Sequence, residues 1–262
     1  MLRFPEDLSK AKILITNDDS IHSDGIKVLE KVARSFSDQV WVVAPETQQS
    51  AAGHSLTIHK PLRIKSYDDA HHSVLGTPTD SVLLGVEHIL KEFRPDIILS
   101  GVNHGQNAAD DVTYSGTIAA AIEGTLLGIP SLAFSQDCEM WAGDDDWEIV
   151  EEYLPKILTK LQGFSWNDNV LLNINFPVEL DENEMGIAVV SQGHYGAVND
   201  GLVECLDPRG RPYFWIGPPP KAKNLYADTD IGALKSGRIT ITPLSLNLTD
   251  EKTLNLLSEV FS

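Results

Sequence analysis

Short apolar segments alternate with amphipathic segments through residue 174 of this 262-residue sequence. The apolar segments predict buried strands, and the segments between them repeat hydrophobic residues at helical spacing. The predicted strands cover residues 13–16, 40–44, 97–100, 130–135 and 170–174. The predicted helices cover residues 25–36, 80–93, 118–127 and 147–161. This alternation indicates an α/β fold with a doubly wound, mostly parallel sheet.

The alternation stops near residue 180. Four further strands are predicted without helices between them, at residues 186–191, 201–206, 213–216 and 238–242, before a short helix at 250–260. We therefore expect a core over residues 1–180 and a β-rich C-terminal extension over residues 181–262. A hairpin in so small an extension often packs on a neighbouring subunit, so we expect a homo-oligomer. Residues 56–64 alternate and contain Pro61, which predicts an edge strand or a projecting hairpin.

The charge of the chain narrows its range of partners. The formal net charge is −18, which disfavours binding to nucleic acid duplexes and anionic membranes. A small anionic substrate stays compatible with this charge, because a bound metal can reverse the local field. The acidic run at 144–146 is interpreted as a solvated loop and helix cap.

Several patterns indicate a cytoplasmic protein. No apolar run approaches the roughly 20 residues that span a bilayer, and residues 1–7 lack the apolar region of a signal peptide. Cys138 and Cys205 match neither a metal-ligand spacing nor a disulfide framework. We interpret them as unpaired thiols in a reducing compartment.

Asn17, Asp18 and Asp19 directly follow the first predicted strand. Ligands of open α/β sheets bind at the carboxyl ends of the strands. Two adjacent carboxylates repel each other unless a cation or a shared proton relieves them, so Asp18 and Asp19 favour a divalent metal. The alternative is an Asx turn that caps the following helix, because Asn and Asp are common at such positions.

Two more loops at the same predicted edge carry oxygen donors. Ser50, flanked by Gln48 and Gln49, follows the second strand, and Asn103 follows the third. Carboxylate, hydroxyl and amide oxygens suit magnesium, manganese or calcium better than zinc.

Ser115, Gly116 and Thr117 stand where a predicted helix begins. The free N–H groups and the dipole of a helix N-terminus favour phosphate binding, although these residues also fit an ordinary Ser/Thr cap. The sequence contains neither the GxGxxG nor the GxxxxGKS pattern of nucleotide-binding loops. A metal beside a phosphate-binding helix end indicates phosphoester hydrolysis, in which the metal polarises the phosphoryl oxygen and lowers the pKa of a bound water.

Longer motifs then become recognisable. They are TNDD at residues 16–19, GTPTD at 76–80, PDIILSGVNHGQN at 95–107, YSGT at 114–117, NINFP at 173–177 and ITPL at 241–244. In these motifs the chain closely resembles the SurE (survival protein E) family of 5'-nucleotidases. The resemblance covers most of the chain in order.

The resemblance implies a site and an activity. One divalent cation (Mg²⁺ or Mn²⁺, with Ca²⁺ as a further option) would be bound by Asp18, Asp19, Ser50 and Asn103. The substrate phosphate would lie near Ser115, Gly116 and Thr117. For catalysis, we expect that an ionised Asp18 or Asp19, or a metal-bound water, starts the attack on the phosphate. The implied substrates are nucleoside 5'-monophosphates, with 3'-nucleotides and short polyphosphate for some members. The implied fold is a Rossmann-like core whose hairpin and C-terminal segment form homodimers or homotetramers.

Three residues depart from the family pattern. Ser20 and Ala51 stand where the family usually has Gly, and Gln48 stands where it commonly has Asn. These departures leave open a non-catalytic nucleotide-binding module, which would bind nucleotide without turnover. Aspartate-rich strand ends with calcium also occur in nucleoside N-glycosidases, so an enzyme that releases a free base rather than phosphate stays open as well.

Overall fold

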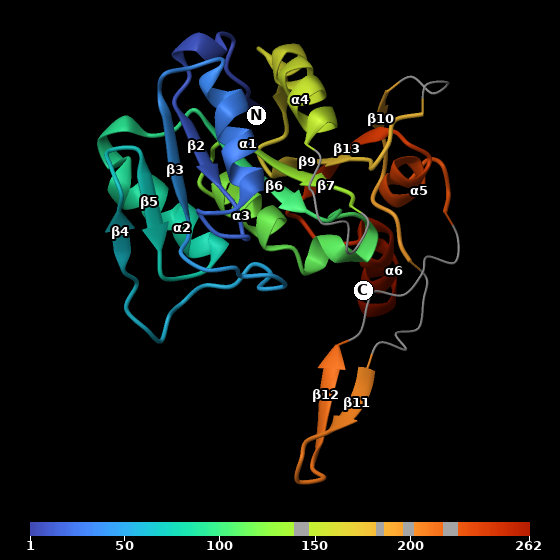
Figure 1. Ribbon diagram of the computed structural model, residues 1–262. Coiled ribbons are helices and arrows are strands. Elements are labelled where there is room, and N and C mark those ends of the chain that lie inside the picture. The colour runs from blue at the N-terminus through green and yellow to red at the C-terminus, as the bar shows by residue number, and fades with distance from the viewer. Residues whose placement is uncertain (139–146, 182–185, 196–201, 217–224) are drawn as a thin grey trace.

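The computed structural model describes residues 1–138, 147–181, 186–195, 202–216 and 225–262. A nine-stranded sheet forms the centre of the fold (Figure 1). In sheet order, its strands are β10 (Ile187–Val189), β13 (Ile239–Ser245), β9 (Val170–Phe176), β7 (Ser131–Gln136), β6 (Ile97–His104), β2 (Ile13–Thr16), β3 (Val40–Pro45), β5 (His71–Val74) and β4 (Ile64–Ser66). A separate pair joins β1 (Leu2–Arg3) to β8 (Ser165–Trp166).

The middle of this sheet is parallel, from β9 through β7, β6, β2 and β3 to β5. Antiparallel pairs flank it, with β13 beside β9 and β4 beside β5. The prediction of a doubly wound, mostly parallel sheet is therefore confirmed. β2 lies between β3 and β6, so the direction in which the chain winds reverses there. A topological switch point of this kind opens a crevice at the strand ends.

Helices cover both faces of the sheet (Figure 1). On one face lie α1 (Asp24–Arg34) and α4 (Glu148–Leu161), and on the other lie α2 (Pro78–Leu84) and α3 (Gly116–Leu126). The alternation of side chains along β2 explains this arrangement: Ile13 and Ile15 pack in the cluster of α1 and α4, while Leu14 packs in that of α2. Short helical turns complete the core at η1 (Leu8–Lys10), η2 (Gly85–Ile89), η3 (Lys91–Phe93) and η4 (Ala109–Thr113).

The prediction of a strand or hairpin over residues 56–64 is wrong for nearly all of that segment. Only Ile64 belongs to a strand, as the first residue of β4. The backbone before it bonds to the start of α2 instead: the Thr57 N–H donates to Asp80 Oδ1 (3.0 Å), and the Thr77 hydroxyl donates to Ser55 O (2.7 Å). The Thr57 N–H is thus bonded to a side chain and not to a partner strand.

The helix predicted at residues 80–93 begins earlier and ends sooner. Thr77 is its N-cap and forms a capping box with Asp80, while Pro78 occupies the first helical turn. A helix starting at residue 80 would have Thr79 as its cap, but the reciprocal bonds between Thr77 and Asp80 move the cap to Thr77. After Leu84 the chain continues as the wider η2 turn and then as η3.

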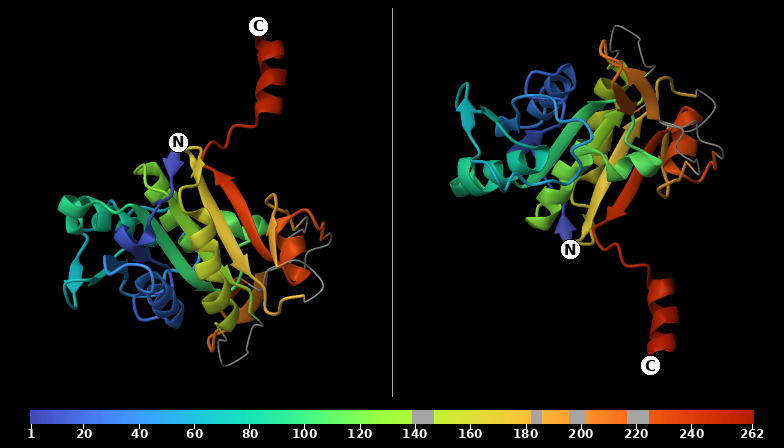
Figure 2. Two further views of the ribbon diagram at one scale, coloured as in Figure 1. Left: turned by 90° about the horizontal axis from the view of Figure 1, so that it is seen from above. Right: turned by 90° about the horizontal axis from the view of Figure 1, so that it is seen from below.

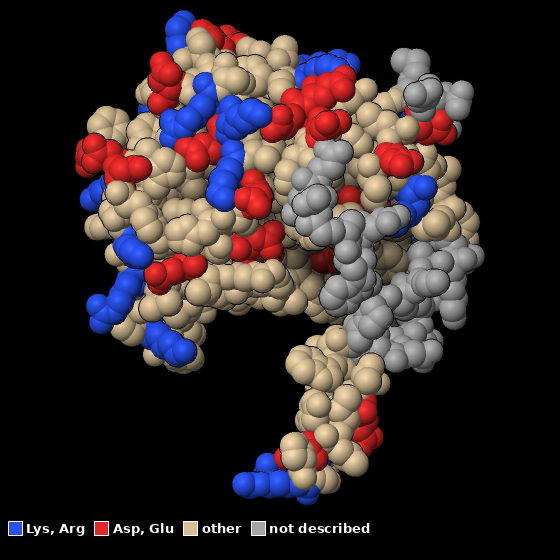
Figure 3. All heavy atoms as spheres, in the orientation of Figure 1, with Lys and Arg blue, Asp and Glu red and all other residues tan. Residues whose placement is uncertain are grey.

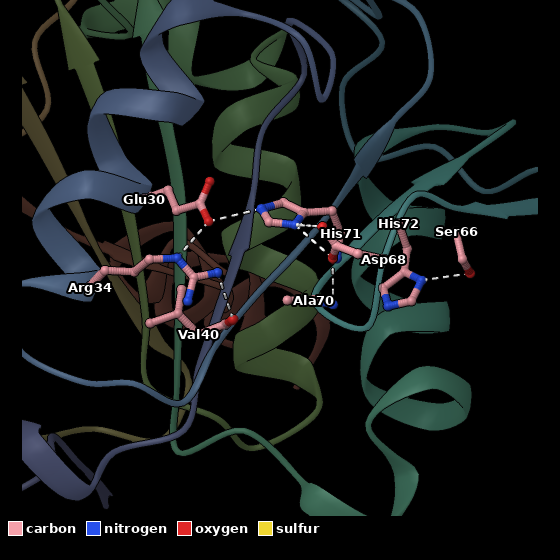
Figure 4. Close-up of polar contacts among 8 residues, drawn as sticks. All are labelled: Glu30, Arg34, Val40, Ser66, Asp68, Ala70, His71 and His72. Atoms are coloured by element: carbon pink, nitrogen blue, oxygen red, sulfur yellow. Dashed lines mark hydrogen bonds and ion pairs between the residues drawn. The ribbon is translucent and has the colours of Figure 1, made fainter.

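A chain of polar contacts fastens β5 to α1 (Figure 4). His71 Nε2 lies 2.9 Å from Glu30 Oε1, and His71 Nδ1 lies 2.8 Å from Asp68 Oδ1. Arg34 extends the chain by donating from Nε to Glu30 Oε1 (2.7 Å) and from Nη2 to Val40 O (3.2 Å). The outer part of the sheet is thus tied to a helix of the core.

Beyond residue 180 the chain both extends the sheet and leaves it. β10 and β13 belong to the central sheet, whereas β11 (Leu202–Leu206) and β12 (Pro212–Ile216) form a hairpin that projects from the body (Figures 1 and 3). The helix α5 (Asp230–Lys235) was not predicted. The helix α6 (Glu251–Phe261) stands away from the body at the end of an extended segment (Figure 2).

Three sequence-based expectations concern single features. Cys138 and Cys205 form no disulfide in the described part of the chain. Among the described residues, no helix has the length and the apolar character needed to cross a membrane. The acidic run at 144–146 lies outside the described residues.

Candidate functional site

A cavity of about 650 Å³ opens at the carboxyl ends of β2 and β6, where the winding of the sheet reverses. Its walls come from the segments after β2, β3, β6 and β7 and from α5. Five of the seven residues singled out in the sequence line it together: Asp18, Asp19, Ser50, Asn103 and Ser115. The structure therefore brings together residues that are up to 97 positions apart in the sequence, because parallel strands end at one edge.

Asp18 is the most enclosed of these residues, with 4% of its surface exposed. One carboxylate oxygen, Oδ1, accepts a hydrogen bond from the Thr117 hydroxyl, and its backbone oxygen accepts one from the Gln49 N–H (2.7 Å). Burial and the neighbouring charge of Asp19 raise the pKa of Asp18 to about 6. The carboxylate is thus held in position and would be stabilised in its charged form by a cation.

Asp19 and Ser50 both line the cavity and share a contact with Gln48. The Gln48 side-chain amide donates to Ser50 Oγ (2.9 Å) and to Asp19 Oδ1 (3.3 Å), so one amide group reaches both oxygens. The His104 N–H lies 3.4 Å from the other carboxylate oxygen of Asp19. Gln48, one of the departures from the family pattern, therefore contacts two of the expected metal ligands directly.

Asn103 lies near the end of β6 and is half-buried. Its side-chain nitrogen donates to Gly105 O (2.8 Å) and approaches His104 O (3.4 Å). Because these carbonyl groups fix the nitrogen, the amide oxygen is the atom left to approach an electropositive group. This is the orientation that an oxygen ligand requires.

The Ser115–Thr117 segment is buried throughout, with one residue at the cavity wall and two behind it. Ser115 lines the cavity and also caps α3, with its side chain accepting from the Ile118 N–H (3.1 Å). Thr117 is fully buried, and its hydroxyl bonds to Asp18. Gly116 is packed so closely that a Cβ there would lie 2.7 Å from the Cβ of Asp18 and 2.8 Å from its Oδ2. Because Gly116 has no side chain, the Asp18 side chain can pack directly against the backbone of α3.

Sequence reasoning missed several residues that line the cavity. Asp111 lies in η4, and its carboxylate accepts a 2.5 Å hydrogen bond from the Tyr195 hydroxyl, while burial raises its pKa. Asp137 follows β7 and pairs with Lys235 of α5, with 2.6 Å between Oδ2 and Nζ. Asp137 could have been found because it lies two residues after the strand predicted at 130–135, whereas Lys235 carries no signal in the sequence.

The electrostatic balance of the lining favours a cation. Four carboxylates contribute to it, from Asp18, Asp19, Asp111 and Asp137, against Lys235 as the single Lys or Arg among the described lining residues. The described part of the chain holds no group of three or more His, Cys, Asp or Glu side chains arranged for a metal. A cation here would therefore need the hydroxyl and amide oxygens of Ser50 and Asn103 beside the two aspartates, a donor set that suits hard divalent ions.

Comparisons with known proteins agree with this geometry. A family model described as "Survival protein SurE" matches residues 13–198. A protein of Paramagnetospirillum magneticum named "5'-nucleotidase SurE" is 48% identical over 255 residues, covering 97% of each chain. A protein of Brucella canis with the same name is 49% identical over 248 residues, covering 92% of this chain and 94% of its own.

The fold is shared as well. The crystal structure of the SurE protein from Aquifex aeolicus superimposes with a TM-score of 0.82 at 35% identity, covering 95% of this chain and 99% of that one. The family match, the relatives and this structure extend over the strand ends that form the cavity. On these grounds, the chain belongs to the SurE family.

Proposed function

We propose that this protein is a metal-dependent phosphomonoesterase that hydrolyses nucleoside 5'-monophosphates to nucleoside and phosphate. The observation that carries the proposal is the meeting of Asp18, Asp19, Ser50, Asn103 and Ser115 in one cavity at the switch point of the sheet. The names of the relatives support the choice of 5'-nucleotides as substrates. Nucleoside 3'-monophosphates and short polyphosphate are further substrates to test.

In this proposal Asp18, Asp19, Ser50 and Asn103 hold one divalent cation. Magnesium or manganese fits the donor set, with calcium as a further option, because every donor is an oxygen. The closely spaced carboxylates, and the raised pKa of Asp18, support a site built for positive charge. When bound, the cation would polarise the phosphoryl oxygen and offset the charge that the phosphate brings.

The two aspartates differ in their surroundings, which supports different roles. Asp18 is fixed by Thr117 and backed by Gly116, so it suits the role of a rigid ligand. Asp19 is half-buried in the cavity wall, where it suits a group that takes a proton from the attacking water. Asp18 is thus the proposed rigid ligand of the cation, and Asp19 is the proposed general base.

We propose that the phosphate of the substrate binds at the N-terminus of α3. The first N–H groups of a helix have no partner within the helix, and its dipole favours an anion at this end. Ser115 satisfies the N–H of Ile118, and the backbone N–H of Thr117 bonds to the Asp18 carboxylate, so the N–H of Gly116 is the donor that we assign to the phosphate. The capping bond of Ser115 is thus compatible with phosphate binding at the same end of α3.

Product analysis tests the reaction class. Incubation of the protein with AMP and Mn²⁺, followed by chromatography, should yield adenosine and phosphate in equal amounts. Free adenine with ribose 5-phosphate would instead identify an N-glycosidase. Binding of AMP without any product would identify a nucleotide-binding module.

Assembly and location belong to the same proposal. We propose that the β11–β12 hairpin and α6 pack against further copies of the chain in a homodimer or homotetramer, because both expose large apolar side chains. The division into a core over residues 1–180 and an extension over residues 181–262 remains a proposal with it. So does the cytoplasmic location that the sequence indicates.

A further inference from the structure

A second cavity adjoins the candidate site and shares a wall with it. This adjoining cavity has a volume of about 660 Å³ and lies between the segment after β9 and the C-terminal end of α5. Asp137, Cys138 and Lys235 line both cavities. A ligand bound at the aspartates could therefore extend past these three residues into the adjoining cavity.

The shared wall is built around the ion pair of Asp137 and Lys235. The Asp137 side chain is 5% exposed, that of Lys235 is 40% exposed, and 2.6 Å separates Oδ2 from Nζ. The backbone of Asp137 is also fixed, since its N–H donates to Phe176 O (2.8 Å). The pair thus offers a carboxylate acceptor and ammonium donors in a constant place.

The charge of this pair indicates which chemical group would bind to it. Its two charges compensate each other, and the neighbouring carboxylates of Asp18, Asp19 and Asp111 disfavour a second anion beside the first. Neutral hydroxyl groups, which both donate and accept hydrogen bonds, match the pair better. A ribose carries such hydroxyl groups.

The position of the pair fits the length of a nucleotide. β2, β6 and β7 are adjacent, and neighbouring strands lie about 4.8 Å apart, so the end of β7 is roughly 10 Å from the end of β2. Asp137 follows Gln136, which pairs in register with His104 of β6. With a phosphate at Asp18, the sugar and base would extend toward Asp137.

The far side of the adjoining cavity is partly apolar. Pro177, Val178 and Leu180 line it, and Val178 exposes 43% of its surface. Apolar side chains next to a few fixed polar groups are typical of pockets for small organic ligands. The flat face of a nucleobase is one group that such a surface accommodates.

We propose that the adjoining cavity binds the nucleoside part of the substrate, with Asp137 and Lys235 hydrogen-bonded to the ribose hydroxyls and the base against Val178 and Leu180. This inference rests on the proposed function, because it presumes that the phosphate of a nucleotide lies at Asp18. It assigns a substrate-binding role to Lys235, a residue of the C-terminal part of the chain.

A bulky side chain in the adjoining cavity provides the first test. Val178→Trp should lower the ratio of kcat/KM for AMP to that for p-nitrophenyl phosphate, which has no nucleoside, by about tenfold, the equivalent of roughly 1.4 kcal/mol. Val189→Trp is the matched control, at a 76% exposed position of β10 away from both cavities. Its ratio should stay at the wild-type value.

Binding of adenosine alone provides a test that needs no turnover. Lys235→Gln, measured by calorimetry, should weaken adenosine binding about tenfold or more, because charge-assisted hydrogen bonds to the ribose are lost. Lys156→Gln is the control: Lys156 also lies 2.6 Å from a carboxylate, that of Glu152, but on the exposed surface of α4. Its adenosine affinity should match that of the wild type.

The outcomes separate this inference from the proposed function. The nucleoside subsite alone would be overturned by the following combination. The wild type releases phosphate, Val178→Trp keeps the wild-type ratio of kcat/KM for AMP to that for p-nitrophenyl phosphate, and Lys235→Gln keeps the wild-type affinity for adenosine. A loss of adenosine affinity in Lys235→Gln, together with no phosphate release by the wild type, would support the subsite and contradict the phosphatase. The subsite would also be overturned if Val178→Trp lowered kcat/KM equally for AMP and p-nitrophenyl phosphate while Lys235→Gln left the affinity for adenosine unchanged.

Discussion

Ser20 and Ala51 lie beside the candidate site in backbone conformations that glycine adopts more easily. φ is +98° at Ser20 and +59° at Ala51. These are the two positions where the chain departs from the glycine that is usual in the SurE family. A left-handed conformation costs an L-residue about 1 kcal/mol or more, because Cβ approaches the neighbouring carbonyl oxygen. Two loops that carry candidate metal ligands are therefore strained locally.

Replacing Ser20 with glycine should relieve part of this strain. We expect Ser20→Gly to raise the melting temperature by about 2–4 °C, which corresponds to roughly 1 kcal/mol for a chain of this size. Ser35→Gly is the control, since Ser35 has φ of −70° and glycine there relieves no strain, while it frees the unfolded chain and removes the bond from the Ser35 hydroxyl to Val32 O. If calorimetry showed that Ser20→Gly lowers the melting temperature as much as Ser35→Gly does, the claim of backbone strain at Ser20 would be wrong.

Single residues of the site differ in how far the sequence could predict them. Asp18, Asp19 and Asn103 stand at the ends of apolar strands, and parallel strands bring such ends together. The sequence alone therefore predicted that three loops with oxygen donors meet at one edge of the sheet. Lys235 belongs to a six-residue helix that is too short for a helical pattern, so only the folded chain places it at the cavity.

At the scale of elements, the contact between β2 and α3 organises the site. The first turn of α3 packs against Asp18 so closely that only glycine fits at position 116. The sequence predicted both elements and their bounds to within about three residues, the usual uncertainty of element ends. It could not predict this packing, because which helix turn meets which strand end depends on the tertiary arrangement.

Gly116→Ala tests that packing. Its Cβ would lie 2.7 Å from the Cβ of Asp18, so the carboxylate must move, and we expect phosphate release to fall about tenfold or more. Gly124→Ala on the same helix is the control, because its Cβ would crowd Ser131 and Ile98 rather than the site. It should lower the melting temperature and leave specific activity nearly unchanged. Full activity in Gly116→Ala would show that the contact is unimportant.

The link between α1 and β5 should make stability depend on pH. Burial favours neutral His71, but hydrogen bonds and the charges of Asp68 and Glu30 outweigh it and raise the pKa of His71 above its usual 6.5. A raised histidine pKa stabilises the fold below pH 6.5, and this contribution is lost as the pH rises through the folded-state value. The stabilisation therefore belongs to mildly acidic solution.

We expect His71→Gln to lower the melting temperature by about 2 °C or more near pH 5.5, and by less near pH 9. His88→Gln, at an exposed position of η2, is the control and should show no such difference between the two pH values. Thermal unfolding followed by circular dichroism measures both variants. An equal destabilisation by His71→Gln at the two pH values would rule out the charged pairing.

At the scale of the whole molecule, two elements expose apolar side chains away from the central sheet. α6 stands apart from the body in Figure 2, and the β11–β12 hairpin projects from it in Figure 3. Every residue of α6 is exposed, and the hairpin exposes Phe214 and Trp215 at 58% and 63%. Exposed apolar surface of this kind marks protein interfaces. The sequence indicated strands and a helix here, but not that β10 and β13 return to the central sheet, because strand order follows from long-range pairing.

Sedimentation of the wild type should therefore show a dimer or tetramer at micromolar concentration. Trp215→Glu should shift this equilibrium toward smaller species by about tenfold or more in dissociation constant, because a charge would be buried at the contact. Leu126→Glu, at a similarly exposed position of α3, should leave the assembly intact. A monomeric wild type would contradict the proposed assembly.

The central claim is that the cavity at the ends of β2 and β6 hydrolyses nucleotides with the help of a cation bound by Asp18 and its neighbours. Phosphate release from nucleoside 5'- and 3'-monophosphates, measured with Mn²⁺, Mg²⁺, Ca²⁺ or a chelator, tests it most directly. We predict release that depends on the added cation, stops with chelator, and falls at least about a hundredfold in a folded Asp18→Asn variant. Release that persists both with chelator and in Asp18→Asn would contradict the claim.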